Sequence, residues 1–313
     1  MTDITNASRT LFFNNKSLKW SKRLLTLFGL QFKRLPEVKE SSSIFGYTNL
    51  NKILKTNIPI SGVMGDSQAS IFANQCFNKG NTKITLGTGA SILTNIGNKY
   101  TSKKNIITTL SYVYQNKPSY SYECLINYAG ATVSWLNSNL EIIKKPEETN
   151  AIFAKTESSN GVIFIPAFVG LSSPHWLPTC KGMIYGLTPS VNKNHVIRSA
   201  LESIAFQIKD YVDDLEKNKK IVCNDIYIDG GIVSNTSFMQ FLANTLKRKI
   251  YVTDFKDMSS YGSLVMGLLG MKIKKNLKDI SIYKQKYSSY FPKKNKFPES
   301  YNEWKDVLKN FYL

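Results

Sequence analysis

The most regular hydrophobic pattern of the chain lies between residues 192 and 216. Apolar side chains recur there at the three- and four-residue spacing of one helix face: Val196, Ile197, Ala200, Leu201, Ile204, Ala205, Ile208, Tyr211, Val212 and Leu215. The charged side chains of Glu202, Lys209, Asp213 and Glu216 fall on the opposite face. The pattern predicts a long amphipathic helix with its apolar face against the core.

Short apolar runs between turn residues predict strands, and they alternate with helical segments. The predicted strands are Ile58–Met64 and Gly161–Ala167, both buried, Lys83–Thr94 (two strands joined by a glycine turn), Ile226–Ile228 and Lys249–Thr253. The predicted helices are Asp66–Cys76 with Asp66 as the N-cap, Ala129–Leu140, about Asn235–Lys247, and about Ser259–Met271. Strands that alternate with helices indicate an α/β core.

Length and composition exclude several classes of protein. A chain of 313 residues with 42% hydrophobic residues can bury a core, which excludes a wholly disordered protein. Its apolar runs are shorter than the roughly 20 residues of a membrane span, and its polar start lacks a signal peptide's features. Four widely spaced cysteines, without a CxxC pair, are expected to be reduced and mostly buried. We expect a soluble cytoplasmic protein.

The net charge of +19 comes almost entirely from lysine, since five of the 41 basic residues are Arg. Proteins that read bases usually use Arg, whose planar group pairs bidentately with guanine and phosphate. The lysines are spread along the chain, and the run Lys272–Lys296 is the one segment dense enough in lysine to form a basic surface. We therefore favour a compositional bias over nucleic-acid binding, although the charge would attract anions such as nucleotides.

Three turns with small residues are candidates for phosphate binding: Gly87–Gly89, Ala129–Ala131 and Asp229–Gly231. Small residues let backbone N–H groups approach a phosphate, and a helix N-terminus adds positive potential. Each turn alone is a weak signal because glycine commonly just makes a turn. Their joint presence is better support, and none of them is a Walker loop or a GxGxxG fingerprint.

Asp66 is the candidate general base, because it lies where an apolar run turns into a helix. Spacing alone favours a plain helix N-cap for this residue, and the catalytic role stays open. The two histidines, His175 and His195, lack a partner pattern and are expected to be structural. No residues of the sequence indicate a metal site made by protein side chains alone.

Several longer segments make the sequence recognisable. They are Thr2–Thr10, Leu35–Val38, Ile60–Asp66, Gly87–Gly89, Pro166–Trp176, Asp229–Gly231, and a signature from Gly182 through Gly186 and His195 to Glu202. On these segments the chain resembles the FGGY family of carbohydrate kinases over nearly its whole length. Within that family the run Asn6–Thr10 is most similar to the glycerol kinases.

The resemblance implies an actin-like, ribonuclease-H-like α/β fold in which substrate and ATP meet in a cleft between two domains. It implies transfer of the ATP γ-phosphoryl group, with Mg²⁺, to the primary hydroxyl of glycerol to give glycerol 3-phosphate. Asp66 matches the family's catalytic carboxylate, which reverses the preference from spacing alone. Thr88, Gly130, Ser134, Gly231 and Asn235 match positions around the nucleotide.

Two departures from the family pattern concern the substrates. Ser67 and Ser134 each stand where glycerol kinases usually carry Gln, the first beside the polyol and the second beside the nucleotide. Because serine is shorter, Ser67 leaves the polyol open: glycerol, or another small polyol or sugar.

The resemblance also implies a division of the chain. Residues 1–76 match the end of the family's N-terminal domain, and residues 77–313 match the whole C-terminal domain. Most of a first domain precedes the Asn6–Thr10 segment in the family. Three interpretations follow: a kinase remnant inactive on its own, a subunit that works with a separate N-terminal half or as a homo-oligomer, or a non-catalytic nucleotide-binding or interaction module. No membrane partner is expected.

Overall fold

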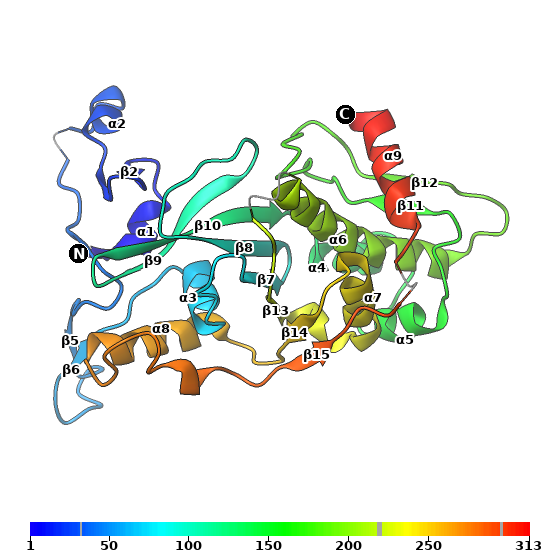
Figure 1. The fold of residues 1–313 in the computed structure, drawn as a ribbon. Helices are drawn as coiled ribbons and strands as arrows, with labels where there is room; N and C mark the ends of the chain where they lie inside the picture. Colours follow the sequence, from blue (N-terminus) through cyan, green and yellow to red (C-terminus); the bar gives the residue numbers. More distant parts are fainter. Residues whose placement is uncertain (32, 218–220, 295–296) are drawn as a thin grey trace.

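The computed structural model describes residues 1–31, 33–217, 221–294 and 297–313. Its centre is a seven-stranded mixed sheet in the order β15–β14–β13–β7–β8–β10–β9 (Figure 1). Strand β13 runs parallel to β7 and β14, and the other neighbours are antiparallel. The strands are β7 (Thr82–Leu86), β8 (Ala90–Gly97), β9 (Ile107–Tyr114), β10 (Lys117–Ile126), β13 (Ile226–Gly230), β14 (Ile250–Val252) and β15 (Ser288–Tyr290).

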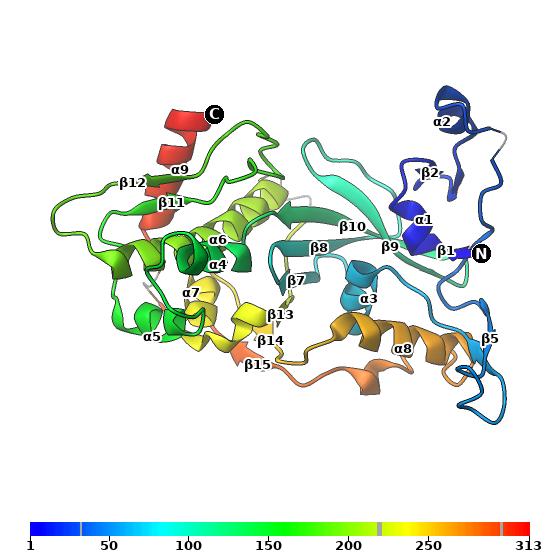
Figure 2. The ribbon, with the colours of Figure 1, turned by 180° about the vertical axis from the view of Figure 1, so that it is seen from behind.

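Helices cover both faces of this sheet. One face packs against α3 (Asp66–Ala73) and α8 (Met258–Gly270), which lie side by side below the sheet in Figures 1 and 2. A Cβ on Gly262 of α8 would lie 1.9 Å from the Ala69 carbonyl oxygen, so glycine permits this close packing. The other face carries a lobe built from α4 (Gly130–Ser138), α5 (Glu148–Lys155), α6 (Lys193–Glu216), α7 (Thr236–Leu246), α9 (Ser300–Tyr312), β11 (Ile163–Ile165) and β12 (Met183–Tyr185).

Helix α6 confirms the strongest sequence prediction. Asn192 caps it, and the Nδ1 atom of His195 accepts the Asn192 N–H at 3.1 Å, which gives this histidine a structural role. The placement of Glu202 on the polar face was wrong. Glu202 is buried and its Oε1 accepts from Arg198 Nε at 2.8 Å, an ion pair that offsets the cost of burying the carboxylate.

Most of the predicted elements are present, but two predictions before residue 77 need correction. The predicted helix at Asp66 ends at Ala73, and its N-cap is Gly65, which has no side chain for capping. The predicted buried strand at Ile58–Met64 is wrong. Only β6 (Ile58–Ile60) forms, paired with β5 (Gly46–Thr48), and both isoleucines are more than 40% exposed because this hairpin has no sheet packed against it.

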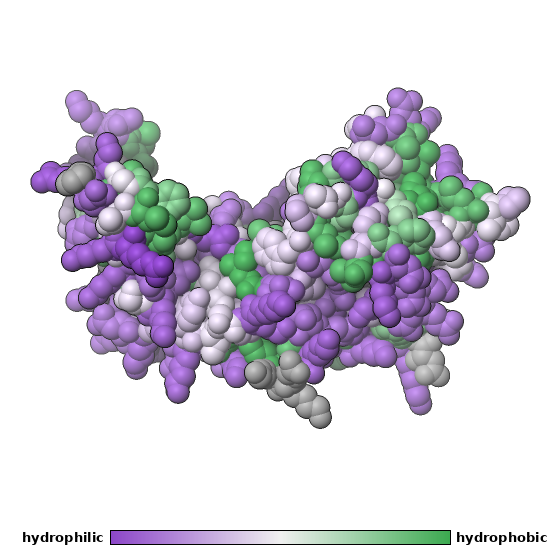
Figure 3. All heavy atoms as spheres, turned by 90° about the horizontal axis from the view of Figure 1, so that it is seen from above, coloured by the Kyte–Doolittle hydropathy of each residue, from purple (hydrophilic) through white to green (hydrophobic). Residues whose placement is uncertain are grey.

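The first 65 residues form small elements beside the main sheet. These are β1 (Thr2–Asp3), α1 (Ile4–Ser8), β2 (Phe13–Asn14), β3 (Lys19–Trp20), α2 (Lys22–Leu27), β4 (Val38–Lys39), β5 and β6. The buried carboxylate of Asp3 organises them, because it accepts hydrogen bonds from Thr5, Asn6 and Ser41. From above, this segment and the α9 lobe rise on either side of a hollowed middle (Figure 3).

The remaining predictions concern single residues. All four cysteines are free and three of them are buried, as predicted, and burial raises the pKa of Cys223 to about 11. His175 Nε2 lies 2.5 Å from Asp210 Oδ2, a partner that the sequence pattern did not indicate. The last two positions of the lysine-rich run, 295 and 296, lie outside the described residues. In the described part of the chain, no helix is long and apolar enough to cross a membrane.

Candidate active site

The turn Gly87–Gly89 joins β7 to β8 at the carboxyl end of β7 and holds the start of α4. The carbonyl groups of Gly87 and Thr88 accept hydrogen bonds from the N–H groups of Gly130 and Ala131, each at 2.9 Å. A Cβ on Gly130 would lie 2.6 Å from the Gly87 oxygen, so only glycine fits there. The first N–H groups of α4 are thus bonded within the protein, and the interpretation of this turn as a phosphate site stays a prediction.

The turn after β13 reaches the same place from the neighbouring strand. Gly230 has a φ of +112°, and a Cβ on it would lie 2.3 Å from the Leu86 carbonyl oxygen. Gly231 begins the 3₁₀ helix η1 (Gly231–Ser234), and a Cβ there would meet nothing within 4 Å. The fold therefore requires glycine at position 230, whereas Gly231 faces open space.

These turns enclose a hollow of about 390 Å³, which we call the first hollow. Its lining includes all five residues that the sequence comparison assigned to the nucleotide: Thr88, Gly130, Ser134, Gly231 and Asn235. It also includes Leu201, which lies in the family signature but was assigned no site role, and Pro146, Glu147, Thr149 and Asn150, which the sequence analysis missed because no glycine turn or quoted family segment marks them. The structure brings together residues that lie up to 147 positions apart.

Asn235, which lines the first hollow, has a side-chain donor without a hydrogen-bond partner among the described residues. Its Oδ1 accepts the N–H of Phe238 at 3.0 Å and so caps α7. Its Nδ2 is buried and has no hydrogen-bond partner among the described residues. A buried donor without a partner is costly to a protein, so this amide is suited to donate to a ligand.

A second hollow of about 400 Å³ lies on the α3 side of the same turn. Asp66, Ser67, Lys83 and Thr85 line it, and Gly87 lines both hollows. The Asp66 side chain is exposed, and its Oδ1 accepts the Ser67 N–H at 2.6 Å. The first turn of α3 thereby orients a carboxylate at the positive end of the helix.

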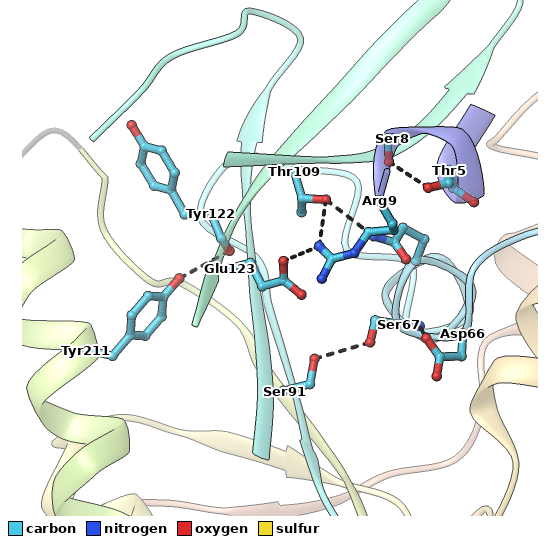
Figure 4. Close-up of polar contacts among 11 residues, drawn as sticks. Thr5, Ser8, Arg9, Asp66, Ser67, Ser91, Thr109, Tyr122, Glu123 and Tyr211 are labelled. Carbon is cyan, nitrogen blue, oxygen red and sulfur yellow. Dashed lines mark hydrogen bonds and ion pairs between the residues drawn. The ribbon is translucent and has the colours of Figure 1, made fainter. Parts of the chain in front are cut away.

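Residues distant in sequence lie near the start of α3 (Figure 4). Ser67 Oγ lies 3.3 Å from Ser91 Oγ of β8. Arg9, which follows α1, forms an ion pair with the buried Glu123 of β10 and donates to Thr109 at 3.4 Å. The predicted Asn6–Thr10 segment therefore lies near α3, whereas Ser91 and Glu123 carried no signal in the sequence.

Comparison with known protein families identifies the family of this chain. Residues 82–271 match the FGGY family of carbohydrate kinases, C-terminal domain, and residues 1–73 match its N-terminal domain. The chain belongs to the FGGY family of carbohydrate kinases. A glycerol kinase of Psychromonas ingrahamii is 35% identical over 314 residues, and one of Thermococcus gammatolerans is 37% identical over 311. Each alignment covers 99% of this chain and 62% of the relative's length.

Solved structures of kinases have the same fold as this chain. The crystal structure of Plasmodium falciparum glycerol kinase with ADP superposes with a TM-score of 0.90 at 35% identity and covers all of this chain and 63% of that one. A ligand-bound xylulose kinase from Lactobacillus acidophilus reaches a TM-score of 0.86 at 18% identity, covering 99% of this chain and 64% of that one, which shows the fold alone. The predicted actin-like α/β kinase fold is confirmed.

Proposed function

We propose that this FGGY kinase chain binds ATP in the first hollow and transfers its γ-phosphoryl group to a primary hydroxyl of a small polyol in the second. Glycerol, which would give glycerol 3-phosphate, is the first candidate acceptor because the glycerol kinases noted above align with 99% of the chain. One observation carries the proposal. The hollow lined by Thr88, Gly231 and Asn235 shares Gly87 with the hollow lined by Asp66.

Each residue of the first hollow has a proposed part in binding the nucleotide. Gly231 leaves its backbone open to close approach by a ligand, and Asn235 offers its unpartnered Nδ2 as a donor. The exposed Thr88 offers a hydroxyl at the turn that separates the two hollows. Ser134, whose hydroxyl donates to the Gly130 carbonyl at 3.3 Å, gives α4 a shorter side chain beside the nucleotide.

Asp66 is the proposed general base. Its carboxylate accepts the proton of the acceptor hydroxyl while that oxygen bonds to the γ-phosphorus of ATP. The bond from the γ-phosphorus to the β–γ bridging oxygen breaks, and ADP leaves with the electron pair. Such transfer depends mainly on positioning and charge neutralisation, and general-base assistance is worth roughly 10²–10⁴ in rate.

Mg²⁺ is expected to reach this site with the nucleotide. Among the described residues, no three His, Cys, Asp or Glu side chains are grouped closely enough to hold a metal ion. Mg²⁺ commonly takes one or two carboxylates and completes its octahedron with phosphate and water oxygens. The ion would therefore be held mainly by phosphate and water oxygens, and we derive no step through it.

The acceptor specificity is proposed to depend on Ser67. Its hydroxyl reaches Ser91 at 3.3 Å and leaves space in the second hollow where a longer side chain would contact the substrate. A larger acceptor, such as another polyol or a sugar, would fill that space. Glycerol and longer polyols, compared as acceptors, decide between these two possibilities.

The organisation and location of the enzyme are further proposals. We keep residues 1–76 and 77–313 as its two units, with a second copy or a separate chain as a candidate partner. Free thiols and consumption of ATP both fit a reducing compartment that supplies the nucleotide, and we propose the cytoplasm.

The test is titration of Mg·ATP into the chain by calorimetry, followed by a coupled assay of ADP release with glycerol. Saturable binding with glycerol-dependent ADP release that Asp66→Asn removes would support the full proposal. Binding without release would restrict it to a nucleotide-binding module or to a site shared with another chain. No binding would contradict it.

A further inference from the structure

The floor of the second hollow contains a lysine that the proposed reaction has not used. Lys83 lies on β7, and the residue is 1% exposed although it lines the hollow together with Asp66. None of the ion pairs among the described residues includes Lys83. A lysine this deeply buried is unusual unless it is paired, so its ammonium group requires a reason.

The strand places Lys83 on the face opposite the main core, where its paired neighbours are Leu93 of β8 and Tyr227 of β13. Lys83 and Thr85 alternate with Ile84 and Leu86 on β7, so they point to the α3 side while the apolar pair joins the main core. The Oγ1 atom of Thr85 is buried and has no hydrogen-bond partner among the described residues. Two donors on the same face of one strand, Lys83 and Thr85, thus line one hollow; Lys83 has no ion-pair partner and Thr85 Oγ1 has no hydrogen-bond partner among the described residues.

Burial and the nearby carboxylates have opposite effects on the charge of Lys83. Burial lowers the pKa of its ammonium group, while the carboxylates of Asp229 and Asp66 act in the opposite direction. Asp229 already accepts hydrogen bonds from Ser70 at 3.2 Å and Asn74 at 3.4 Å. A bound anion would favour the charged form of Lys83 and supply the close partner that these carboxylates do not.

We propose that Lys83 and Thr85 form a subsite for the terminal phosphoryl group, the one that moves from the nucleotide to the acceptor. The identity of the anion rests on the proposed function, whereas the subsite itself rests on the geometry. Gly87 lines both hollows, so the turn that follows Thr85 and Leu86 lies between the nucleotide and this floor. Lys83 would hold the group by a charge-assisted hydrogen bond and neutralise part of its charge.

The test compares ATP with ADP, which differ by this one phosphoryl group. Both nucleotides are titrated by calorimetry, without acceptor, into the wild type, Lys83→Met, Lys83→Arg and Thr85→Val. We expect Lys83→Met to weaken ATP binding about tenfold or more and to leave ADP binding within about twofold. Lys83→Arg should keep most of the preference for ATP, and Thr85→Val should lose about threefold for ATP only.

The matched control is Lys309→Met, which removes the same charge from an exposed position on α9. It should change neither affinity, because the net charge of +19 attracts both nucleotides generally. Equal losses for ATP and ADP in Lys83→Met, or no loss for either, would overturn the subsite. If Lys83→Met does not fold, Thr85→Val decides in the same way.

Failure of the proposed function gives a different result. If neither nucleotide binds the wild type, orthophosphate is titrated and followed by ³¹P resonance. Saturable phosphate binding that Lys83→Met weakens and Lys309→Met preserves would uphold the anion subsite without a kinase site. No phosphate binding, or equal phosphate binding by the wild type and Lys83→Met, would overturn the anion subsite.

Discussion

The two hollows on either side of the Gly87–Gly89 turn differ in the groups that line them. The first is lined mainly by glycine backbone, hydroxyl and amide groups and by leucines, with Glu147 as its one acidic residue. The second contains Asp66 and the buried Lys83, the two charged residues of its lining. A mainly uncharged lining suits the binding of a large ligand, whereas opposed charges suit proton transfer and charge neutralisation. The Gly87–Gly89 turn thus lies between a hollow suited to binding the nucleotide and a hollow suited to the transfer reaction.

The glycines of these turns also divide into two kinds. At Gly130 and Gly230 an added Cβ would collide with backbone oxygens at 2.6 and 2.3 Å, so the fold requires them. At Gly231 nothing lies within 4 Å, and at Gly87 the nearest atom is 3.7 Å away. The fold does not require glycine at these two positions, and both of them line the hollows. Under the proposed function, a ligand rather than the fold accounts for glycine at these two positions.

Removing the charge of Asp66 should give the largest effect and would separate chemistry from binding. We expect Asp66→Asn to lower glycerol-dependent ADP release by roughly 10²–10⁴ while ATP affinity stays unchanged, because the carboxylate lines only the second hollow. The control is Asp306→Asn on the exposed face of α9, which should retain full activity. A parallel loss of ATP affinity in Asp66→Asn would contradict the separation.

The glycine comparison predicts a loss of stability at one of two adjacent positions. Gly230→Ala must relieve both a positive φ and the contact with the Leu86 oxygen, and should lower the free energy of unfolding by about 1–3 kcal/mol. Gly231→Ala should change that free energy by less than about 0.5 kcal/mol. Urea denaturation of both variants measures the difference, and equal losses would remove the distinction between the two kinds of glycine.

Two substitutions of Asn235 distinguish its role as the N-cap of α7 from its role as a donor to the nucleotide. Asn235→Ser keeps a capping oxygen for α7 but removes Nδ2, so ATP affinity should fall about three- to tenfold with little change in unfolding free energy. Asn235→Ala loses the cap as well and should cost about 1 kcal/mol of stability. Calorimetry and denaturation of both variants provide the measurement. Unchanged ATP affinity in Asn235→Ser would show that the donor does not serve the nucleotide.

The smallest expected effect concerns the acceptor. Ser67→Gln restores the longer amide that glycerol kinases usually carry and should lower the KM for glycerol about two- to tenfold through one added hydrogen bond. The ATP affinity should not change, because Ser67 does not line the first hollow. A rise in the KM for glycerol, with a fall for a larger polyol, would favour a different natural acceptor.

Local patterns in the sequence predicted the core better than the segments around it. The glycine turn between β7 and β8 and the helix α6 follow from spacing alone, since buried periodic segments leave few alternatives. The run Ile58–Met64 looked equally apolar, yet its exposure depends on whether a sheet covers it, which no local pattern records. Glu202 was misplaced for a different reason: the pattern was judged by its apolar residues, and the ion pair with Arg198, four residues earlier on the same helix, makes burial possible.

The candidate site shows the same limit. Family matches indicated Asp66 and five of the residues that line the first hollow, although spacing alone favoured a helix cap for Asp66. The structure added Lys83, Thr85 and Ser91, which line the second hollow through strand pairing and carry no motif. It also showed that the first N–H groups of α4 bond to the Gly87–Gly89 turn, a choice of hydrogen-bond partner that sequence does not specify.

One measurement tests the central claim that the first hollow is the nucleotide site. Mg·ATP is titrated by calorimetry into the wild type, Gly231→Ala and Gly46→Ala, the last of which adds the same Cβ in open space on β5, outside both hollows. We predict saturable binding by the wild type and Gly46→Ala, and affinity about tenfold or more weaker in Gly231→Ala at an unchanged melting temperature. Equal affinity in all three proteins, or no binding by any of them, would contradict the claim.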